Sequence, residues 1–245
     1  NQEIHHHYPP PESNPLGLDS TAEVNLFHLP TPSTPLIGRE IELAQLTQAF
    51  ENPKTRLATI IAPGGIGKSA LTDAWLKRYA PDYHGMQRVF AWSFYSQGQH
   101  QTYTNSSAFF QAVLPFLGVK DIPQTEVEKA RSLANCLQNQ AVLLILDGIE
   151  PLQQAPHLGG FLQDGGIKEL LAQLRRGNRS FVLLSSRQAV QELEDWEEDL
   201  SFSLPLHTLK DDEGALLLAK LKVTGSEAQR QALSRNLGGH ALSLV

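Results

Sequence analysis

The sequence predicts a three-layer α/β sandwich around a five-stranded parallel sheet, followed by the start of a small helical domain. Short apolar segments alternate with segments of helical periodicity over residues 36–206. This order produces parallel strands with helices on both faces. Beyond residue 207 only the helical periodicity continues. We therefore expect three units: an N-terminal segment over 1–35, an α/β domain over 36–206 and part of a helical domain over 207–245.

Residues 1–35 are predicted to form a proline-rich arm or linker. They contain seven of the 15 prolines and no Lys or Arg. A segment of this composition without apolar periodicity is not expected to build a core of its own. The folded part of the chain should therefore begin near residue 36.

The α/β domain is predicted from two kinds of pattern. Short β-branched and apolar runs mark strands, and they cover residues 56–62, 88–94, 141–147, 180–185 and 200–204. Apolar residues three or four apart mark helices, and they cover residues 41–50, 68–80, 106–117, 125–138 and 167–176. Two further helices are expected in the C-terminal unit, over 211–221 and 227–237.

Composition and charge exclude several classes of function. A single cysteine, Cys136, cannot build a disulfide framework or a multi-cysteine zinc site. The formal charge of −6, with scattered Lys and Arg, argues against a dedicated nucleic-acid binder. The longest apolar run, 141–146, is far shorter than the ~20 residues of a membrane helix. We therefore expect a cytoplasmic protein without a membrane partner.

The strongest chemical signal is the run Ala-Pro-Gly-Gly-Ile-Gly-Lys-Ser at 62–69, directly between a predicted strand and a predicted helix. This is the context of a phosphate-binding loop, in which glycines let backbone N–H groups surround an anion. Lys68 should reach the β- and γ-phosphates of a nucleotide, and the Ser69 hydroxyl should bind Mg²⁺. Ala62 departs mildly from the usual first glycine. The residues expected to bind phosphate are Pro63, Gly64, Gly65, Ile66, Gly67, Lys68, Ser69 and Ala70.

Three further residues are expected at the same edge of the sheet. Asp147 ends the strand 141–147 and could orient Mg²⁺ through water. Glu150 is the nearest acid able to polarise an attacking water, with an ordinary surface position before Pro151 as the alternative. Arg187 follows the strand 180–185 and would face the γ-phosphate, with a solvated loop arginine as the alternative.

The order of five segments resembles that of the STAND NTPases, the signal-transduction ATPases that include NB-ARC and NACHT proteins. The segments are Gly38-Arg39-Glu40, the GGIGKS loop, LLILDGIE, LLSSR and GGHALSL. The resemblance covers about residues 36–245 and implies a P-loop NTPase fold. It further implies that Ile37, Gly38 and Arg39 contact adenine or ribose, that Arg187 senses the γ-phosphate, and that Ala241 occupies the position of a proline that lies against adenine.

The same resemblance implies a nucleotide-dependent signalling switch. Such a module rests with ADP, exchanges it for ATP with Mg²⁺, hydrolyses ATP slowly and self-associates, in roles such as defence or regulatory signalling. Effector and sensor domains would lie outside this chain. Two alternatives stay open: a scaffold that holds ADP without turnover, which the departures at Ala62 and Ala241 permit, and a constitutive ATPase or kinase. The kinase is the least favoured of these, because a kinase is expected to carry an arginine-rich lid and residues 188–200 are acidic and contain no Lys or Arg.

Overall fold

The computed structural model describes residues 22–32, 36–95, 105–177 and 179–245. Its centre is one six-stranded sheet in the order β1-β3-β4-β5-β2-β6. The strands are β1 (Glu23–Asn25), β2 (Leu57–Ile61), β3 (Arg88–Ser93), β4 (Val142–Asp147), β5 (Phe181–Ser186) and β6 (Ser201–Pro205). Every neighbouring pair is parallel, which confirms the predicted type of sheet.

The prediction of five strands was wrong by one, because β1 lies in the segment expected to be an arm. This strand of three residues pairs in parallel with residues 88–90 of β3. Just beyond it, the ring of His28 packs on Trp92 with centroids 4.3 Å apart. The open edge of β3 supplies the hydrogen bonds, so a run this short and without periodicity can still become a strand.

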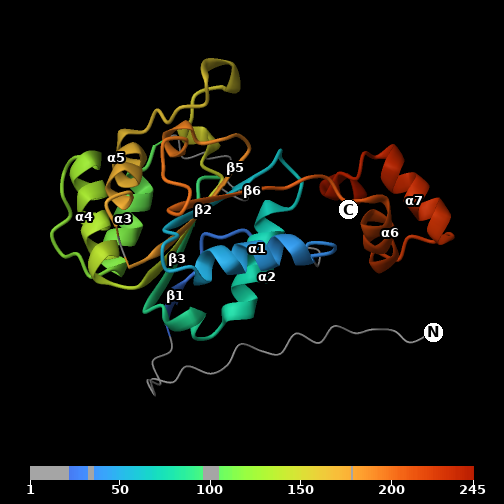
Figure 1. Ribbon diagram of the computed structural model, residues 1–245, viewed down its shortest axis with the longest axis horizontal. Coiled ribbons are helices and arrows are strands. Elements are labelled where there is room, and N and C mark those ends of the chain that lie inside the picture. The colour runs from blue at the N-terminus through green and yellow to red at the C-terminus, as the bar shows by residue number, and fades with distance from the viewer. Residues whose placement is uncertain (1–21, 33–35, 96–104, 178) are drawn as a thin grey trace.

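Helices cover both faces of the sheet, as Figure 1 shows. One face packs against α1 (Glu40–Glu51) and α2 (Lys68–Tyr79), the other against α3 (Ser107–Phe116), α4 (Glu126–Asn139) and α5 (Gly165–Leu174). Four 3₁₀ turns lie between the described elements of the sandwich: η1 (Tyr83–Gly85), η2 (Glu150–Leu152), η3 (Pro156–Leu158) and η4 (Gln191–Leu193). A fifth, η5 (Ala241–Leu244), lies near the C-terminal end. The three-layer sandwich is confirmed.

The core consists of two apolar clusters separated by the sheet. All six residues of β4 are buried, because this central strand is covered on both faces. The apolar run at 88–94 favours core positions for Trp92 and Phe94, and both belong to the cluster on the side of α3, α4 and α5. The sequence of residues 95–98 fits either an ordinary turn or a loop that responds to nucleotide or packs on a neighbouring subunit, and only Tyr95 of these four falls within the described residues.

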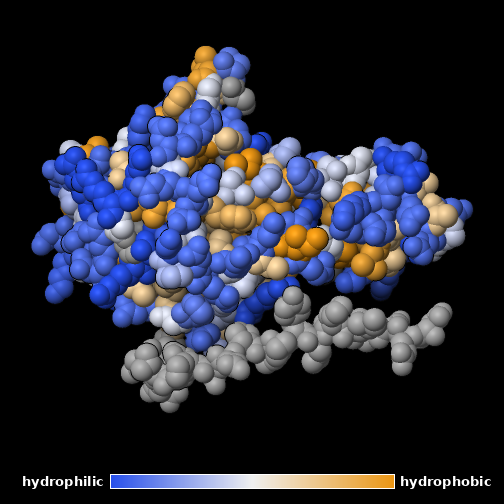
Figure 2. Space-filling model, viewed as in Figure 1, coloured by the Kyte–Doolittle hydropathy of each residue, from blue (hydrophilic) through white to orange (hydrophobic). Residues whose placement is uncertain are grey.

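The C-terminal residues form two helices, α6 (Asp211–Lys220) and α7 (Glu227–Asn236), beside one end of the sandwich (Figure 1). Both end one residue before the predicted positions. A third apolar cluster joins α6 and the C-terminal 3₁₀ turn η5 to the segment before α1, and its buried residues are Ile37, Leu209, Leu217, Leu218 and Leu244. Hydrophobic atoms are also visible at the surface of this junction in Figure 2. Within the part of the chain that the structure describes, no helix is long and apolar enough to cross a membrane.

Candidate functional site

The glycine-rich loop occupies residues 62–67, between the end of β2 and the first residue of α2. Gly65 and Gly67 have φ angles of +76° and +110°, which side chains other than glycine rarely adopt. Gly67 directly precedes α2, so the unpaired N–H groups of the first helical turn lie at the loop. The loop and the helix N-terminus together form the kind of site that binds phosphate.

The side chain of Lys68 folds back onto the start of the loop. Its ammonium donates hydrogen bonds to the carbonyl oxygens of Ala62 at 2.6 Å and Pro63 at 3.2 Å. Burial lowers the pKa of Lys68, and the negative charges of Glu150 and Asp147 partly offset that effect. The charge is therefore held at the mouth of the loop, where an entering phosphate group would meet it.

Asp147 lies at the end of β4 among three serine hydroxyls. Ser185 donates to its Oδ1 at 2.6 Å, while Ser93 and Ser69 donate to its Oδ2 at 3.4 and 3.5 Å. Burial raises the pKa of Asp147, and these hydrogen bonds and the charge of Lys68 only partly offset that rise. The hydroxyls come from β5, β3 and α2, so three elements orient a single carboxylate.

The pair of Ser69 and Asp147 offers the oxygen ligands that Mg²⁺ prefers. A Mg²⁺ ion commonly keeps several waters and takes one or two protein oxygens together with phosphate. A hydroxyl 3.5 Å from a buried carboxylate fits that requirement. No cluster of three or more His, Cys, Asp or Glu suited to a metal occurs among the described residues. The donor set therefore fits an ion held jointly with phosphate rather than one enclosed by protein.

Glu150 and Arg187 face each other at the mouth of the loop. The Nε atom of Arg187 is 3.8 Å from Oε1 of Glu150, and its guanidinium carbon lies 5.1 Å from the centre of the Tyr95 ring. A Cβ atom added at Gly64 would be 3.5 Å from that same carbon, so the guanidinium lies beside the loop. Burial raises the pKa of Glu150, and the positive charges of Lys68 and Arg187 partly offset it.

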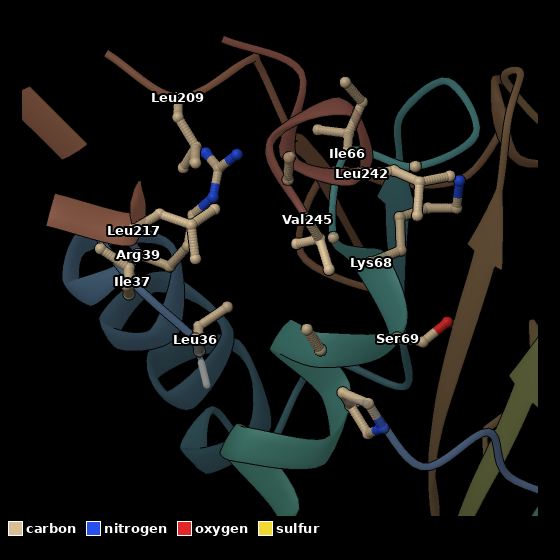
Figure 3. Close-up of a pocket in the computed structure, with 15 residues that line it drawn as sticks. Leu36, Ile37, Arg39, Ile66, Lys68, Ser69, Leu209, Leu217, Leu242 and Val245 are labelled. Carbon is tan, nitrogen blue, oxygen red and sulfur yellow. The ribbon is translucent and has the colours of Figure 1, made fainter. Parts of the chain in front are cut away.

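A cavity of about 250 Å³ begins at the loop and extends toward the C-terminal helices. Figure 3 shows its wall: the start of α1 and the segment 209–217 lie opposite the loop and the C-terminal turn. The predicted residues that line it are Ile37, Arg39, Gly65, Ile66, Gly67, Lys68, Ser69, Ala70 and Ala241. Its other lining residues are mostly apolar, and they are Pro32, Leu36, Leu209, Leu217, Leu242 and Val245.

Gly38, Pro63 and Gly64 are predicted to contact nucleotide but do not line this cavity. Gly38 borders a neighbouring cavity, and its φ of +66° lets the side chain of Glu213 on α6 approach its backbone closely. Pro63 is exposed, and Gly64 faces Arg187 instead.

Arg39 connects the start of α1 to the segment that leads into α6. Its guanidinium is buried and donates to Oε1 of Glu42 at 2.6 Å and to the backbone carbonyl of His207 at 2.5 Å. Arg39 thus fixes one wall of the cavity, in addition to lining it.

Four residues at this site were not singled out as site residues from the sequence. Ser93 and Ser185 hydrogen-bond to Asp147, and the Tyr95 ring packs on the backbone of Gly148. His240 contacts the loop through Gly64. The paired serines of the segment LLSSR offered a signal for Ser185, since polar residues seldom end a buried strand without a partner.

Comparisons with known proteins agree with this geometry. The family described as AAA ATPase domain matches residues 35–215. No curated protein matches the sequence. Among solved structures, a STAND protein with a tetratricopeptide repeat sensor from Pyrococcus horikoshii is similar over 94% of this chain and 31% of its own, with a TM-score of 0.57 and 15% identity.

Two Aeropyrum pernix structures are similar in the same way. The ORC2 protein, solved as ADPNP–ADP complexes, has a TM-score of 0.56 and 19% identity over 88% of this chain and 63% of its own. The ORC1 protein in complex with DNA has a TM-score of 0.53 and 19% identity over 85% of this chain and 58% of its own. This chain thus spans less than two thirds of each of these three proteins.

At these identities the structural matches establish the fold, which is the P-loop NTPase fold that the motifs predict. One of the three similar proteins, from Pyrococcus horikoshii, is itself a STAND protein, the class that the motifs resemble. The family match covers well over half of the sequence and includes the loop 62–69, Asp147 and Arg187. The chain therefore belongs to the AAA ATPase domain family.

Proposed function

We propose that this chain is an ATP- and ADP-binding module that acts as a nucleotide-dependent switch. The observation that carries the proposal is the shared cavity, which is lined by the phosphate-binding loop, by the residues before α1 and by the C-terminal helical unit. A ligand that touches both parts stabilises one arrangement of them over another. Nucleotide in this cavity would therefore control how the two parts sit.

Each side chain at the loop has a role in this proposal. Lys68 would leave its carbonyl partners and bind the β- and γ-phosphates. Ser69 and Asp147 would hold Mg²⁺, which when bound neutralises phosphate charge. Glu150 would orient the attacking water. The long contact of Arg187 with Glu150 and its 55% exposed side chain leave the guanidinium free to turn toward a γ-phosphate.

The apolar part of the cavity suits a purine base. Ile37, Leu209, Leu217 and Ala241 offer apolar surface beside Lys68, and such surface with few polar groups is typical of small-molecule sites. The choice of adenine rests on the resemblance to STAND NTPases, and the Aeropyrum pernix ORC2 complexes with ADPNP and ADP are compatible with it.

Self-association in the ATP-bound state and a role in defence or regulatory signalling complete the proposal. Sensor and effector domains would lie outside this chain, in keeping with the sensor of the Pyrococcus horikoshii protein, of which the chain matches 31%. The formal charge of −6 gives no support to a DNA partner, although the similar ORC1 structure contains DNA.

The test is to identify the nucleotide that the purified chain carries and to measure its ATP turnover with Mg²⁺. Lys68→Ala should abolish both binding and turnover. Lys77→Ala is the matched control, because Lys77 lies on the same helix, is 71% exposed and pairs only with Asp73 among the described contacts.

The outcomes separate the three functions. Bound ADP near one per chain, with turnover far below the ~10 s⁻¹ of an ordinary enzyme, supports the switch, and self-association with a non-hydrolysable ATP analogue would extend it. Bound ADP without any turnover or self-association indicates the scaffold. An empty site with rapid turnover that depends on Lys68 would overturn the switch in favour of a constitutive ATPase.

A further inference from the structure

The C-terminal turn, residues 240–245, lies directly on the phosphate-binding loop. Nε2 of His240 is 2.8 Å from the carbonyl oxygen of Gly64, and the backbone N–H of Leu242 donates to the carbonyl oxygen of Gly65 at 3.0 Å. Two successive carbonyls of the loop are therefore bound by one short segment that follows them by about 175 residues in the chain.

The chemistry of these partners fixes the state of the imidazole. A carbonyl oxygen can only accept a hydrogen bond, so Nε2 of His240 carries the hydrogen. Nδ1 lies 3.2 Å from the hydroxyl of Ser243, which can donate to it in the neutral ring. His240 is thus held from both sides, with its donor directed at the loop.

The packing shows independently that loop and turn fit closely. A Cβ atom added at Gly65 would collide with Cε1 of His240 and would lie 2.8 Å from Cβ of Leu242. At Gly67 the same addition would meet no heavy atom within 4 Å. The loop is therefore closely covered at Gly65 but not at Gly67.

We infer that His240 is a positioning residue that fixes the phosphate-binding loop in its anion-binding shape. In a trans peptide the N–H points away from the preceding carbonyl. When His240 and Leu242 bind the carbonyls of Gly64 and Gly65, the N–H groups of Gly65 and Ile66 are turned away from them. Those two residues line the cavity, so their N–H groups become available to phosphate.

This inference rests on the proposed function and adds that the C-terminal turn controls the affinity of the loop for phosphate. Because coupling between two binding events is reciprocal, phosphate in the loop would also hold the C-terminal turn in place. Affinity for the phosphate part of a nucleotide would then depend on whether the turn is docked. The notable feature is that this control acts through the loop backbone, without His240 touching the ligand.

The test compares His240→Ala and His240→Gln by calorimetry with three probes: ADP, pyrophosphate and adenosine. His240→Ala should weaken ADP and pyrophosphate about five- to tenfold, the effect of one hydrogen bond, with little change for adenosine. His240→Gln should restore most of the loss, because its amide N–H can reach the Gly64 carbonyl. His207→Ala is the control, since that side chain is exposed.

Other results would overturn the inference. Equal ADP affinity in the wild type and His240→Ala would show that the contact has no role in binding. Equal weakening of adenosine and ADP would show that His240 only supports the fold of the pocket. A wild type that binds neither ADP nor ATP would instead overturn the proposed function itself.

A second measurement needs no substitution, in case His240→Ala does not fold. Pyrophosphate should slow hydrogen exchange at the Leu242 amide of the wild type several-fold, because it stabilises the docked turn. An unchanged exchange rate, at a pyrophosphate concentration where calorimetry shows a saturated site, would contradict the coupling.

Discussion

Asp147 lies where it could help to bind Mg²⁺, but its burial destabilises the folded chain when no cation is bound. Burial raises the pKa of its carboxyl group, and the three serine hydroxyls compensate only in part. A buried carboxylate without a full set of partners is unfavourable. Since a bound cation would supply the missing charge, the cost is a property of the ligand-free chain.

Asp147→Asn should therefore stabilise the ligand-free chain by about 1–2 kcal/mol at neutral pH, as substitutions at strained functional sites often do. A carboxyl group whose pKa is higher in the folded state loses stability as pH rises above its unfolded value near 3.8. The gain should thus shrink as pH falls toward that value. Urea unfolding over a pH series measures both effects.

The control is Asp199→Asn, which removes the same charge from a side chain that is 64% exposed and pairs with Lys54. It should change stability by less than about 1 kcal/mol, because exposed ion pairs contribute little. Asp147→Asn should also lose the Mg²⁺-dependent part of nucleotide affinity. If it left stability unchanged or lowered it at neutral pH, the account of a costly buried charge would be wrong.

Glu150→Gln separates binding from chemistry. The substitution keeps the shape of the side chain but removes the carboxylate that orients water, so turnover should fall about 10²- to 10⁴-fold while ADP affinity stays the same.

Arg187→Ala should weaken the affinity for ATP relative to that for ADP, because the guanidinium would contact only the γ-phosphate. Stopped-flow binding and single-turnover assays check both variants.

Arg175→Ala is the arginine control, since Arg175 is exposed directly after α5 and donates to the backbone carbonyl of Asp195, away from the loop. A loss of ADP affinity in Glu150→Gln equal to its loss of turnover would assign Glu150 to binding. An Arg187→Ala variant with unaltered ATP preference would leave Arg187 as the solvated loop residue of the alternative interpretation.

The sequence predicts part of this site because motifs are local. Lys68 and Ser69 belong to one short pattern, and Asp147 ends one apolar run. Ser93 belongs to no such pattern, and the segment GGHALSL, which contains His240, does not reveal which residue His240 contacts. The contacts of Ser93 and His240 cross 54 and 176 positions of the chain. Such contacts arise only when strands are placed side by side or when a terminal turn docks, which periodicity does not encode.

At the scale of elements, long periodic segments are predicted almost to the residue. The buried strand 142–147 and helices α2 and α6 begin where, or within one residue of where, their patterns begin. β1 is different, because Glu23–Asn25 becomes a strand only through the free edge of β3. Pairing with a neighbouring strand, rather than the local sequence, therefore determines that these residues form a strand.

The pairing of α6 and α7 depends on a glycine. A Cβ atom at Gly214 would collide with the Ser234 hydroxyl and lie 2.7 Å from its Cβ. Gly214→Ala should therefore destabilise the helical pair by about 1–3 kcal/mol despite the better helix propensity of alanine. Thermal unfolding should show the loss, and Ser234→Gly in the same chain should restore most of it.

Gly165→Ala is the matched control, because Gly165 is also helical but an added Cβ there meets no heavy atom within 4 Å. That variant should be neutral or slightly more stable. If both alanine variants behaved alike, close packing between α6 and α7 would not be what requires the glycine.

At the scale of the whole molecule, the apolar cluster that joins the C-terminal unit to the sandwich is much smaller than the two clusters that pack on the sheet. This joining cluster has five buried residues, from Ile37 to Leu244. Three of these, Ile37, Leu209 and Leu217, also line the cavity, so they would contact both the helical unit and a bound base. A nucleotide in the cavity would therefore add to a small interface and strengthen the link between the two parts.

ADP should consequently protect amide groups in parts of the chain that are distant in sequence. Hydrogen exchange should slow together over 36–39, 65–70, 209–217 and 241–245, which supply most of the cavity wall. The outer helix α4 should exchange as before, because it packs on the far face of the sheet. At 100 times the dissociation constant, ADP should add about 2.7 kcal/mol to stability. Protection confined to 65–70 would mean that nucleotide binds the loop without joining the two parts, and the switch would lose its physical basis.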